Sequence, residues 1–182
     1  MKESYIEFST PWNKKLIGAV LIRWIENRRY SHVVLRYFNE AKGEWQVLEA
    51  YAGGVRIADV ATFTKTNEII RSFKLTAPEE LLKAAIDKTD DSLGNGYGYL
   101  SVVGQIVGKI CRALGVKSTI PFRDGRKTEF CSETIAYFLK QLAPDMSEDL
   151  KDYERMTPSE IDSMLQACLG KEMANGIKVY LN

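Results

Sequence analysis

The chain has 182 residues, of which 45% are hydrophobic and 27% are charged, a balance typical of a soluble globular protein and unlike that of a disordered or fibrous one. Its 25 lysines and arginines almost equal its 24 aspartates and glutamates. It therefore lacks the positive charge that attracts proteins to phosphate backbones, and nucleic acid is not expected as a partner. We expect one domain over 1–182, because two domains would each have too small a core.

The first predicted elements are a helix and a set of strands. The pattern predicts a helix over 11–26, with Ser9 and Thr10 as capping residues, Pro11 in the first turn and apolar residues at helical spacing. The next part, 31–75, contains four short segments rich in β-branched and aromatic residues, and turn-like stretches separate the first three. This texture predicts an antiparallel meander.

The rest of the chain is predicted to be mainly helical. A helix begins at Pro78, a glycine-rich turn runs into an apolar helix over 94–116, and two further helices cover 131–143 and 156–170. The last helix has a capping residue, a capping-box glutamate and a terminating glycine, which are Thr157, Glu160 and Gly170. The order of helix, meander and helices predicts an α+β domain.

The three cysteines, Cys111, Cys131 and Cys168, are widely spaced, form no CxxC pair and are accompanied by a single histidine. This number and spacing fit neither a disulfide framework nor a metal site, and we expect no cofactor and no metal. Cys168 is predicted in the middle of its helix, where a cysteine is usually a packing residue. We interpret Cys111 in the same way.

Cys131 differs because it opens a predicted helix. Cys131, Ile135 and Phe138 recur at helical spacing, so the sulfur belongs to the inward stripe but lies in the first turn. The positive end of the helix dipole there favours the thiolate, which is the nucleophilic form, and a neighbouring imidazolium would favour it further. The alternative is that this cysteine is a small buried hydrophobic residue.

His32 is the only histidine and lies near the start of the first predicted strand, in the sequence RYSHVVLRY. Glu49 lies one hairpin later on the next strand, so the two side chains can share a face of the sheet. A carboxylate that accepts the second N–H of an imidazole fixes its tautomer and supports its positive charge. We therefore expect a triad of Cys131, His32 and Glu49. The structural alternatives are a packed strand histidine and a solvated strand carboxylate.

Four stretches carry a resemblance to a known family: RYSHVVLRY, VLEAYAGGVRI, EFCSETIAYFL and MTPSEI. Over residues 5–165 the chain resembles the circularly permuted branch of the NlpC/P60 papain-like superfamily, the YiiX/YaeF-like cysteine hydrolases, including short phage and prophage members. In that branch the cysteine follows the histidine, as it does here. The resemblance implies a permuted papain-like fold of the α+β class, in which an antiparallel β-meander or barrel packs against helices and the nucleophile stands at a helix N-terminus.

The resemblance also implies roles for individual residues. It makes Cys131 the nucleophile, with its backbone N–H as the first oxyanion donor, His32 the general base and then acid, and Glu49 the orienting residue. Ser31 and Ser132 match the motifs beside the histidine and the cysteine and are assigned to substrate binding. First-turn helix chemistry explains Ser132 equally well.

The family also has a tyrosine near its catalytic residues. In this chain it corresponds to Tyr97 or Tyr99, in the sequence GYGYL, and the motif does not decide between them. Both are assigned to substrate binding. The chain departs from the commoner family pattern here, because neither tyrosine is followed by aspartate.

The implied reaction is attack of a thiolate on a carbonyl, followed by release of the acyl-enzyme to water or another acceptor. We expect a cysteine-dependent amidase or peptidase, or an acyl hydrolase, acting on a peptide or an acyl-containing small molecule. The alternatives are a lipid acyltransferase or thioesterase of the lecithin:retinol acyltransferase type and a non-catalytic binding module. A membrane or lipid partner is less favoured, because the amphipathic stretch 100–116 suits an ordinary core equally well.

The N-terminal sequence MKESYIEFSTPWNKK contains no apolar segment of the length of a signal peptide, and no run of about 18 apolar residues occurs. We therefore expect a cytoplasmic protein, and the family resemblance implies a bacterial or phage origin. Basic residues cluster in 23–29 and 123–127, close to the candidate site residues, where they can equally be solvated surface.

Overall fold

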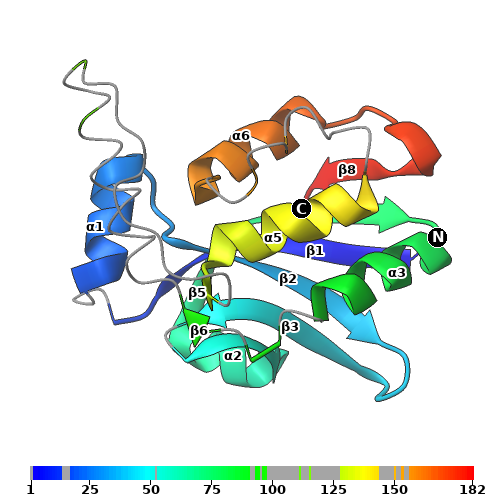
Figure 1. The fold of residues 1–182 in the computed structure, drawn as a ribbon, viewed down its shortest axis with the longest axis horizontal. Coiled ribbons are helices and arrows are strands. Elements are labelled where there is room, and N and C mark those ends of the chain that lie inside the picture. Colours follow the sequence, from blue (N-terminus) through cyan, green and yellow to red (C-terminus); the bar gives the residue numbers. More distant parts are fainter. Residues whose placement is uncertain are drawn as a thin grey trace.

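The computed structural model describes residues 2–13, 17–51, 53–90, 93–94, 96–97, 111, 115, 128–143, 150, 153 and 156–182. Its centre is an antiparallel sheet of six strands that does not close into a barrel, in the order β4-β3-β2-β1-β5-β8 (Figure 1). The six strands are β1 (Lys2–Pro11), β2 (His32–Asn39), β3 (Glu44–Tyr51), β4 (Gly54–Asp59), β5 (Asn67–Ala77) and β8 (Lys178–Leu181). The α+β class is therefore confirmed, while the barrel alternative is wrong.

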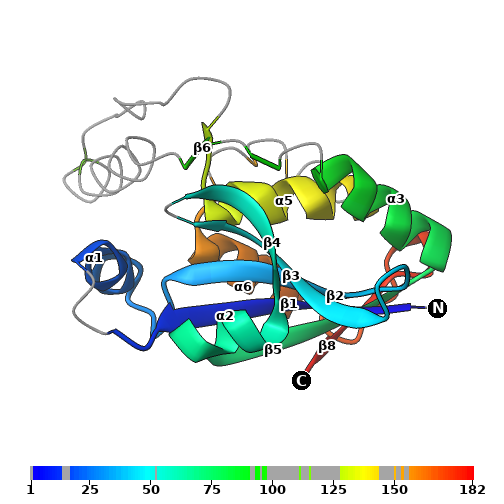
Figure 2. The ribbon, with the colours of Figure 1, turned by 90° about the horizontal axis from the view of Figure 1, so that it is seen from below.

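Helices cover both faces of this sheet. In Figure 2, α5 and α3 lie on one side and the short α2 lies on the other. The helices are α1 (Ile17–Glu26), α2 (Val60–Thr66), α3 (Glu79–Asp90), α5 (Cys131–Leu142) and α6 (Pro158–Ala167). The main core lies between the sheet and α3, α5 and α6, and a smaller cluster lies under α2. Among the described residues, no helix is long and apolar enough to cross a membrane.

The N-terminal segment is a strand where the sequence analysis placed the start of a helix. Ser9, Thr10 and Pro11 all belong to β1, so their predicted capping roles are wrong, and the first helix is α1, which begins at Ile17. β1 pairs with β2 on one side and β5 on the other, and Ile6 and Phe8 are fully buried. Pairing with two distant strands outweighs the local helix signal here.

The predicted meander is correct for three of its four strands. β2, β3 and β4 follow one another as antiparallel neighbours. The fourth strand, β5, instead crosses the sheet to pair with β1, because α2 intervenes between β4 and β5. This helix was missed: Asp59 caps its N-terminus by accepting a hydrogen bond from the Thr62 N–H at 2.7 Å.

Strand alternation separates the two faces of β2. Val33 and Leu35 pack in the main core beneath α5, whereas Val34 packs in the α2 cluster. The side chain of His32 belongs to the same face of β2 as that of Val34, two residues later, but His32 is the first residue of the strand. It therefore lies at the end of the sheet, where side chains of both layers can meet.

The helices at the C-terminal end largely match expectation. α5 begins at Cys131, and α6 has the predicted capping box, in which Thr157 accepts from the Glu160 N–H while the Glu160 carboxylate accepts from the Thr157 N–H. Gly170, the predicted stop, has a positive φ of 70°. Cys168 is the C-terminal capping residue of α6, so its predicted mid-helix position is wrong.

Besides β1, three further strands in the described part of the chain were not predicted. β8 forms an edge of the main sheet, and two short parallel strands, β6 (Gly96–Tyr97) and β7 (Thr128–Glu129), pair just before α5. Apart from 94, 96–97, 111 and 115, the predicted glycine-rich turn and apolar helix over 94–116 lie outside the described residues.

Candidate active site

Cys131 occupies the first position of α5, as predicted. Phe130 precedes it in an extended conformation and supplies no side-chain hydrogen bond to the helix N-terminus. The cysteine is 4% exposed, and it packs in the main core with Ile135 on its inward side. The thiol therefore combines a buried environment with the positive end of a helix dipole. All three cysteines of the chain are free.

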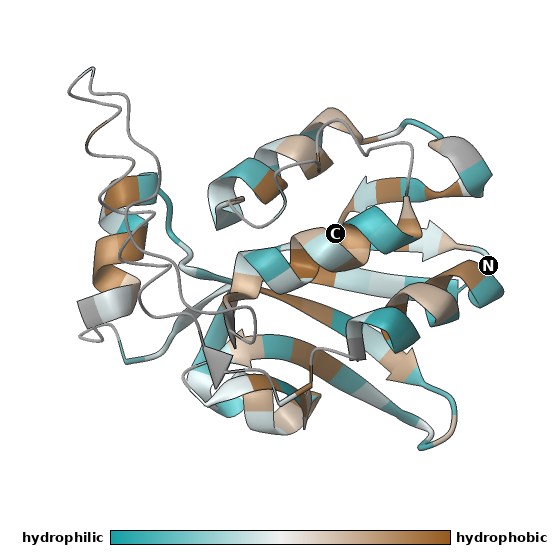
Figure 3. Cartoon of the chain, in the orientation of Figure 1, coloured by the Kyte–Doolittle hydropathy of each residue, from teal (hydrophilic) through white to brown (hydrophobic). Residues whose placement is uncertain are grey.

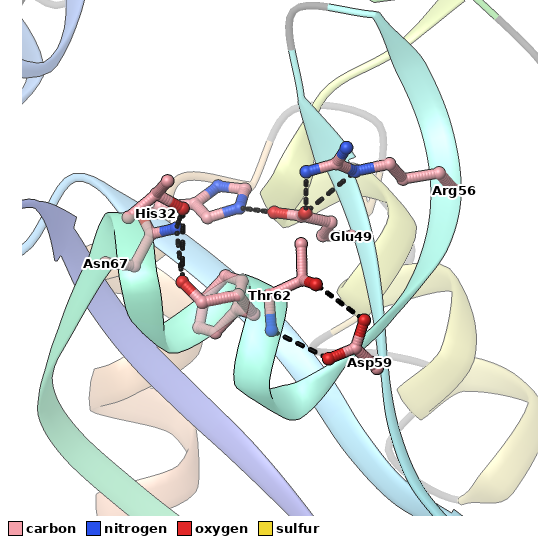
Figure 4. A network of polar contacts seen from close by, with 8 residues as sticks. His32, Glu49, Arg56, Asp59, Thr62 and Asn67 are labelled. Carbon is pink, nitrogen blue, oxygen red and sulfur yellow. Dashed lines mark hydrogen bonds and ion pairs between the residues drawn. The ribbon is translucent and has the colours of Figure 1, made fainter.

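His32 joins the cysteine to the carboxylate. Its Nε2 lies 2.9 Å from Glu49 Oε2, so this ring nitrogen is engaged by β3 (Figure 4). Its imidazole also interacts with the Cys131 side chain, and this interaction raises the pKa of His32. Because Nε2 is taken by Glu49, Nδ1 is the nitrogen left for the sulfur. The three residues expected to form a triad are brought together in that order.

The surroundings of His32 favour its charged form. Burial alone lowers the pKa of the imidazole, but the negative charge of Cys131 and the hydrogen bonds to Cys131 and Glu49 outweigh it and raise the pKa of His32 to about 10. The imidazole is only 14% exposed, so these interactions are weakly screened. An imidazolium at neutral pH is the partner that a nucleophilic thiolate requires.

Arg56 is a member of this site that the sequence analysis missed. It stands opposite Glu49 in the pairing of β3 with β4, and its Nε and Nη2 lie 3.0 and 2.7 Å from Glu49 Oε1. Its guanidinium also stacks 3.6 Å above the centre of the Tyr51 ring. Register from a correctly predicted hairpin would have placed Arg56 beside Glu49, so this residue could have been found.

Glu49 is buried, with only 2% of its surface exposed. Burial favours the neutral acid, yet hydrogen bonds and charge from His32, followed by those from Arg56, hold the pKa of the Glu49 carboxyl below its ordinary value. Each of its oxygens has a cationic partner. A buried carboxylate in this position stays ionised and keeps a fixed orientation toward the imidazole.

The helix missed in the sequence supports His32 from the other side. The ring of Phe63, on α2, lies 6.4 Å from the imidazole, centre to centre, and is buried. Figure 4 shows α2 next to His32, with Asp59 and Thr62 closing its first turn. This apolar contact excludes water from one side of the imidazole.

The two predicted serines occupy buried positions. Ser132 is fully buried, and its hydroxyl donates to the Met156 carbonyl at 2.6 Å, which ties the start of α5 to the segment before α6. Ser31 is also buried, and its backbone N–H donates to the Ser9 carbonyl at 3.0 Å. This geometry favours an anchoring role for Ser132 over contact with a substrate.

The two predicted tyrosines are described to different extents. The backbone of Tyr97 belongs to β6 and pairs with Glu129 in β7, two residues before Cys131. The segment is therefore next to the nucleophile. Tyr99 lies outside the described residues.

A second buried polar network supports the segment before His32. Tyr30 donates from its hydroxyl to Asp162 Oδ2 at 2.6 Å, and Arg71 Nη1 lies 2.8 Å from Asp162 Oδ1. Asp162, on α6, is buried. Burial of the Tyr30 phenol and its hydrogen bond to Asp162 raise the pKa of that phenol. The network fixes the approach of the chain to β2.

Comparison with protein-family models and with curated proteins found no match. The site therefore has to be interpreted from its own geometry. Within the described part of the chain, no group of three or more histidine, cysteine, aspartate or glutamate side chains is arranged to hold a metal ion.

Proposed function

We propose that the protein is a cysteine-dependent hydrolase of the permuted papain-like type, an amidase or peptidase that acts on a peptide or acyl amide or ester through an acyl-enzyme. The observation that carries the proposal is the chain of contacts from Cys131 through His32 to Glu49. A thiol at a helix start, an imidazole that interacts with it and a buried carboxylate on a ring nitrogen match the three roles that nucleophilic catalysis needs.

The reaction begins with Cys131 as thiolate and His32 as imidazolium. The sulfur attacks the substrate carbonyl carbon, and the negative charge moves to the carbonyl oxygen, near the N–H groups of the first turn of α5. The C–N or C–O bond then breaks as His32 Nδ1 gives its proton to the leaving group. A water molecule, deprotonated by the neutral imidazole, attacks the thioester and releases the acid.

Glu49 and Arg56 act on this reaction through the imidazole. Glu49 holds the ring with Nε2 toward itself. It stabilises the positive charge that the ring carries before acylation and regains when it takes a proton from water. Arg56 keeps the carboxylate ionised and directs its second oxygen away from the ring. Neither side chain exchanges a proton with the substrate in this mechanism.

The test is alkylation of each cysteine by iodoacetamide as a function of pH, followed by mass spectrometry, in the wild type and in His32→Ala. We expect Cys131 to react well below pH 8.5, the value near which a free thiol ionises, and to slow when His32 is removed. Cys111 and Cys168 provide internal comparisons within the same chain. If Cys131 reacts no faster than Cys168, or if His32→Ala changes nothing, the proposed pair does not exist.

A second experiment tests the covalent step. Incubation with p-nitrophenyl acetate should release p-nitrophenol and leave an acetyl group on Cys131, detected on the intact protein and located by peptide mapping. Cys131→Ala should lose both signals and keep the circular dichroism spectrum of the wild type. Cys168→Ser, which removes a partly buried thiol at the end of α6, should keep both. Acetylation at another residue would contradict the assignment of the nucleophile.

A further inference from the structure

An exposed apolar face on α1 is the surface feature that the proposed function does not use. Val20, Leu21 and Trp24 fall on one stripe of this helix, and all three are exposed, Trp24 to 76%. Trp12 is also exposed. It lies two residues after Thr10, whose hydroxyl accepts a hydrogen bond from Arg23 of α1. These four apolar residues are among the nine large hydrophobic side chains exposed in the described part of the chain. A group of exposed apolar side chains on one surface marks an interaction site more often than single exposed apolar residues do.

Figure 1 shows α1 at one end of the fold, far from α3, and Figure 3 shows apolar residues along much of its length. Its contacts to the rest of the described structure include a hydrogen bond from Arg23 to Thr10 and one from the Ser159 N–H to Glu26. Both hold the polar side of the helix against the protein and leave the apolar stripe outward.

The charges around this stripe identify its partner. Arg28 and Arg29 are exposed just after α1, and Lys65 is exposed on α2, beside the Thr64 and Thr66 carbonyls that accept hydrogen bonds from Trp12. The acidic residue on α1, Glu26, is engaged by the N-terminus of α6. An apolar stripe with tryptophan, followed by exposed arginines at the C-terminal end of the helix, matches the requirements of an anionic lipid surface.

We propose that α1 binds the interface of an anionic lipid bilayer, with Val20, Leu21 and Trp24 in the apolar boundary and Arg28 and Arg29 at the headgroups. Trp12 borders the same surface. The proposal is independent of catalysis. The chain passes from α1 through Arg28 and Arg29 to His32, so binding in this way brings the candidate active site close to the bilayer.

The test is flotation of the full-length Cys131→Ala protein with vesicles of phosphatidylcholine alone or of phosphatidylcholine with phosphatidylglycerol. We expect binding to the anionic vesicles, weaker binding to the neutral ones, and loss of binding as salt concentration rises. The fluorescence of Trp24 should shift to the blue on binding. Absence of binding to anionic vesicles would overturn the proposal.

Two variants locate the surface. Arg28→Gln with Arg29→Gln should weaken binding about 30-fold, from about fivefold for each basic residue near an anionic surface, and Trp24→Ser should weaken it about tenfold or more. Matched controls are Leu181→Ser, an exposed apolar residue on the edge strand β8, and Lys42→Gln with Lys171→Gln, exposed residues elsewhere.

The control variants should bind the vesicles as the parent protein does. Because all the substitutions change exposed side chains, every variant should keep the circular dichroism spectrum of the parent protein. Equal binding by the arginine variant would overturn the proposal. The proposal would also be overturned if the parent protein did not bind vesicles and formed dimers that Trp24→Ser abolished. The stripe would then be a contact between two copies of the chain.

Discussion

Glu49 Oε2 lies 2.9 Å from His32 Nε2, with the carboxylate on β3 and the imidazole at the first position of the adjacent strand β2. The contact directs the other ring nitrogen toward Cys131 and keeps a positive charge on the ring energetically favourable. It is the relationship on which the reactivity of the thiol is expected to depend most directly.

Replacement of Glu49 by glutamine tests this relationship. The amide keeps the size of the side chain but carries no charge, so the pKa of His32 should fall and the ion pair with Cys131 should weaken. We expect the pH midpoint of Cys131 alkylation to rise by about one unit. Glu44→Gln, an exposed residue at the other end of β3, is the matched control and should leave the midpoint in place. An unchanged midpoint in Glu49→Gln would show that this carboxylate does not act on the thiol.

Arg56 is a positioning residue, and two substitutions separate its charge from its geometry. Arg56→Gln removes the cation beside Glu49 Oε1, so the pKa of Glu49 should rise and the acid limb of the alkylation profile should move to higher pH. Arg56→Lys keeps the charge but loses the paired hydrogen bonds, and should restore part of the shift. If both variants lower stability equally and leave the acid limb unmoved, Arg56 is only structural.

The charge on His32 should also be visible in folding stability at alkaline pH. A pKa of about 10 in the folded protein, against about 6.5 for an ordinary histidine, means that the folded state holds this proton more tightly than the unfolded state. The resulting stabilisation is complete below about pH 6.5 and disappears as the pH rises through 10.

The check is urea unfolding at pH 8 and at pH 10.5, for the wild type and for His32→Gln. The stability difference between the two proteins should be smaller at pH 10.5. A difference that stays constant or grows with pH would contradict a raised pKa for His32.

Ser132→Ala should affect the stability of the fold more than the reactivity of the cysteine. The substitution leaves the buried Met156 carbonyl without its donor, which costs about 1–3 kcal/mol of unfolding free energy. The alkylation midpoint of Cys131 should stay within experimental error. Ser163→Ala, an exposed serine on α6, serves as the control and should be close to neutral. A normal stability combined with a raised KM for a substrate would instead place Ser132 in substrate binding.

The sequence by itself determined the parts of this protein that depend on near neighbours. Cys131 stands at the start of α5, and the apolar spacing of the residues that follow it indicates this helix. His32 and Glu49 share a site because one hairpin joins their strands, and Thr157 starts α6 through a capping box with Glu160, three positions later. Each signal is encoded within a few residues, or within one hairpin, so the local sequence suffices.

The tertiary structure decided which distant segments meet. β1 is a strand because it lies between β2 and β5, and local helix propensity at Ser9–Pro11 gives way to hydrogen bonding on both sides. α2 places Phe63 against His32. Such contacts join elements far apart in the chain, and their energies depend on the packing of the whole sheet. No window of sequence contains the partners of these residues, so only the fold could identify them.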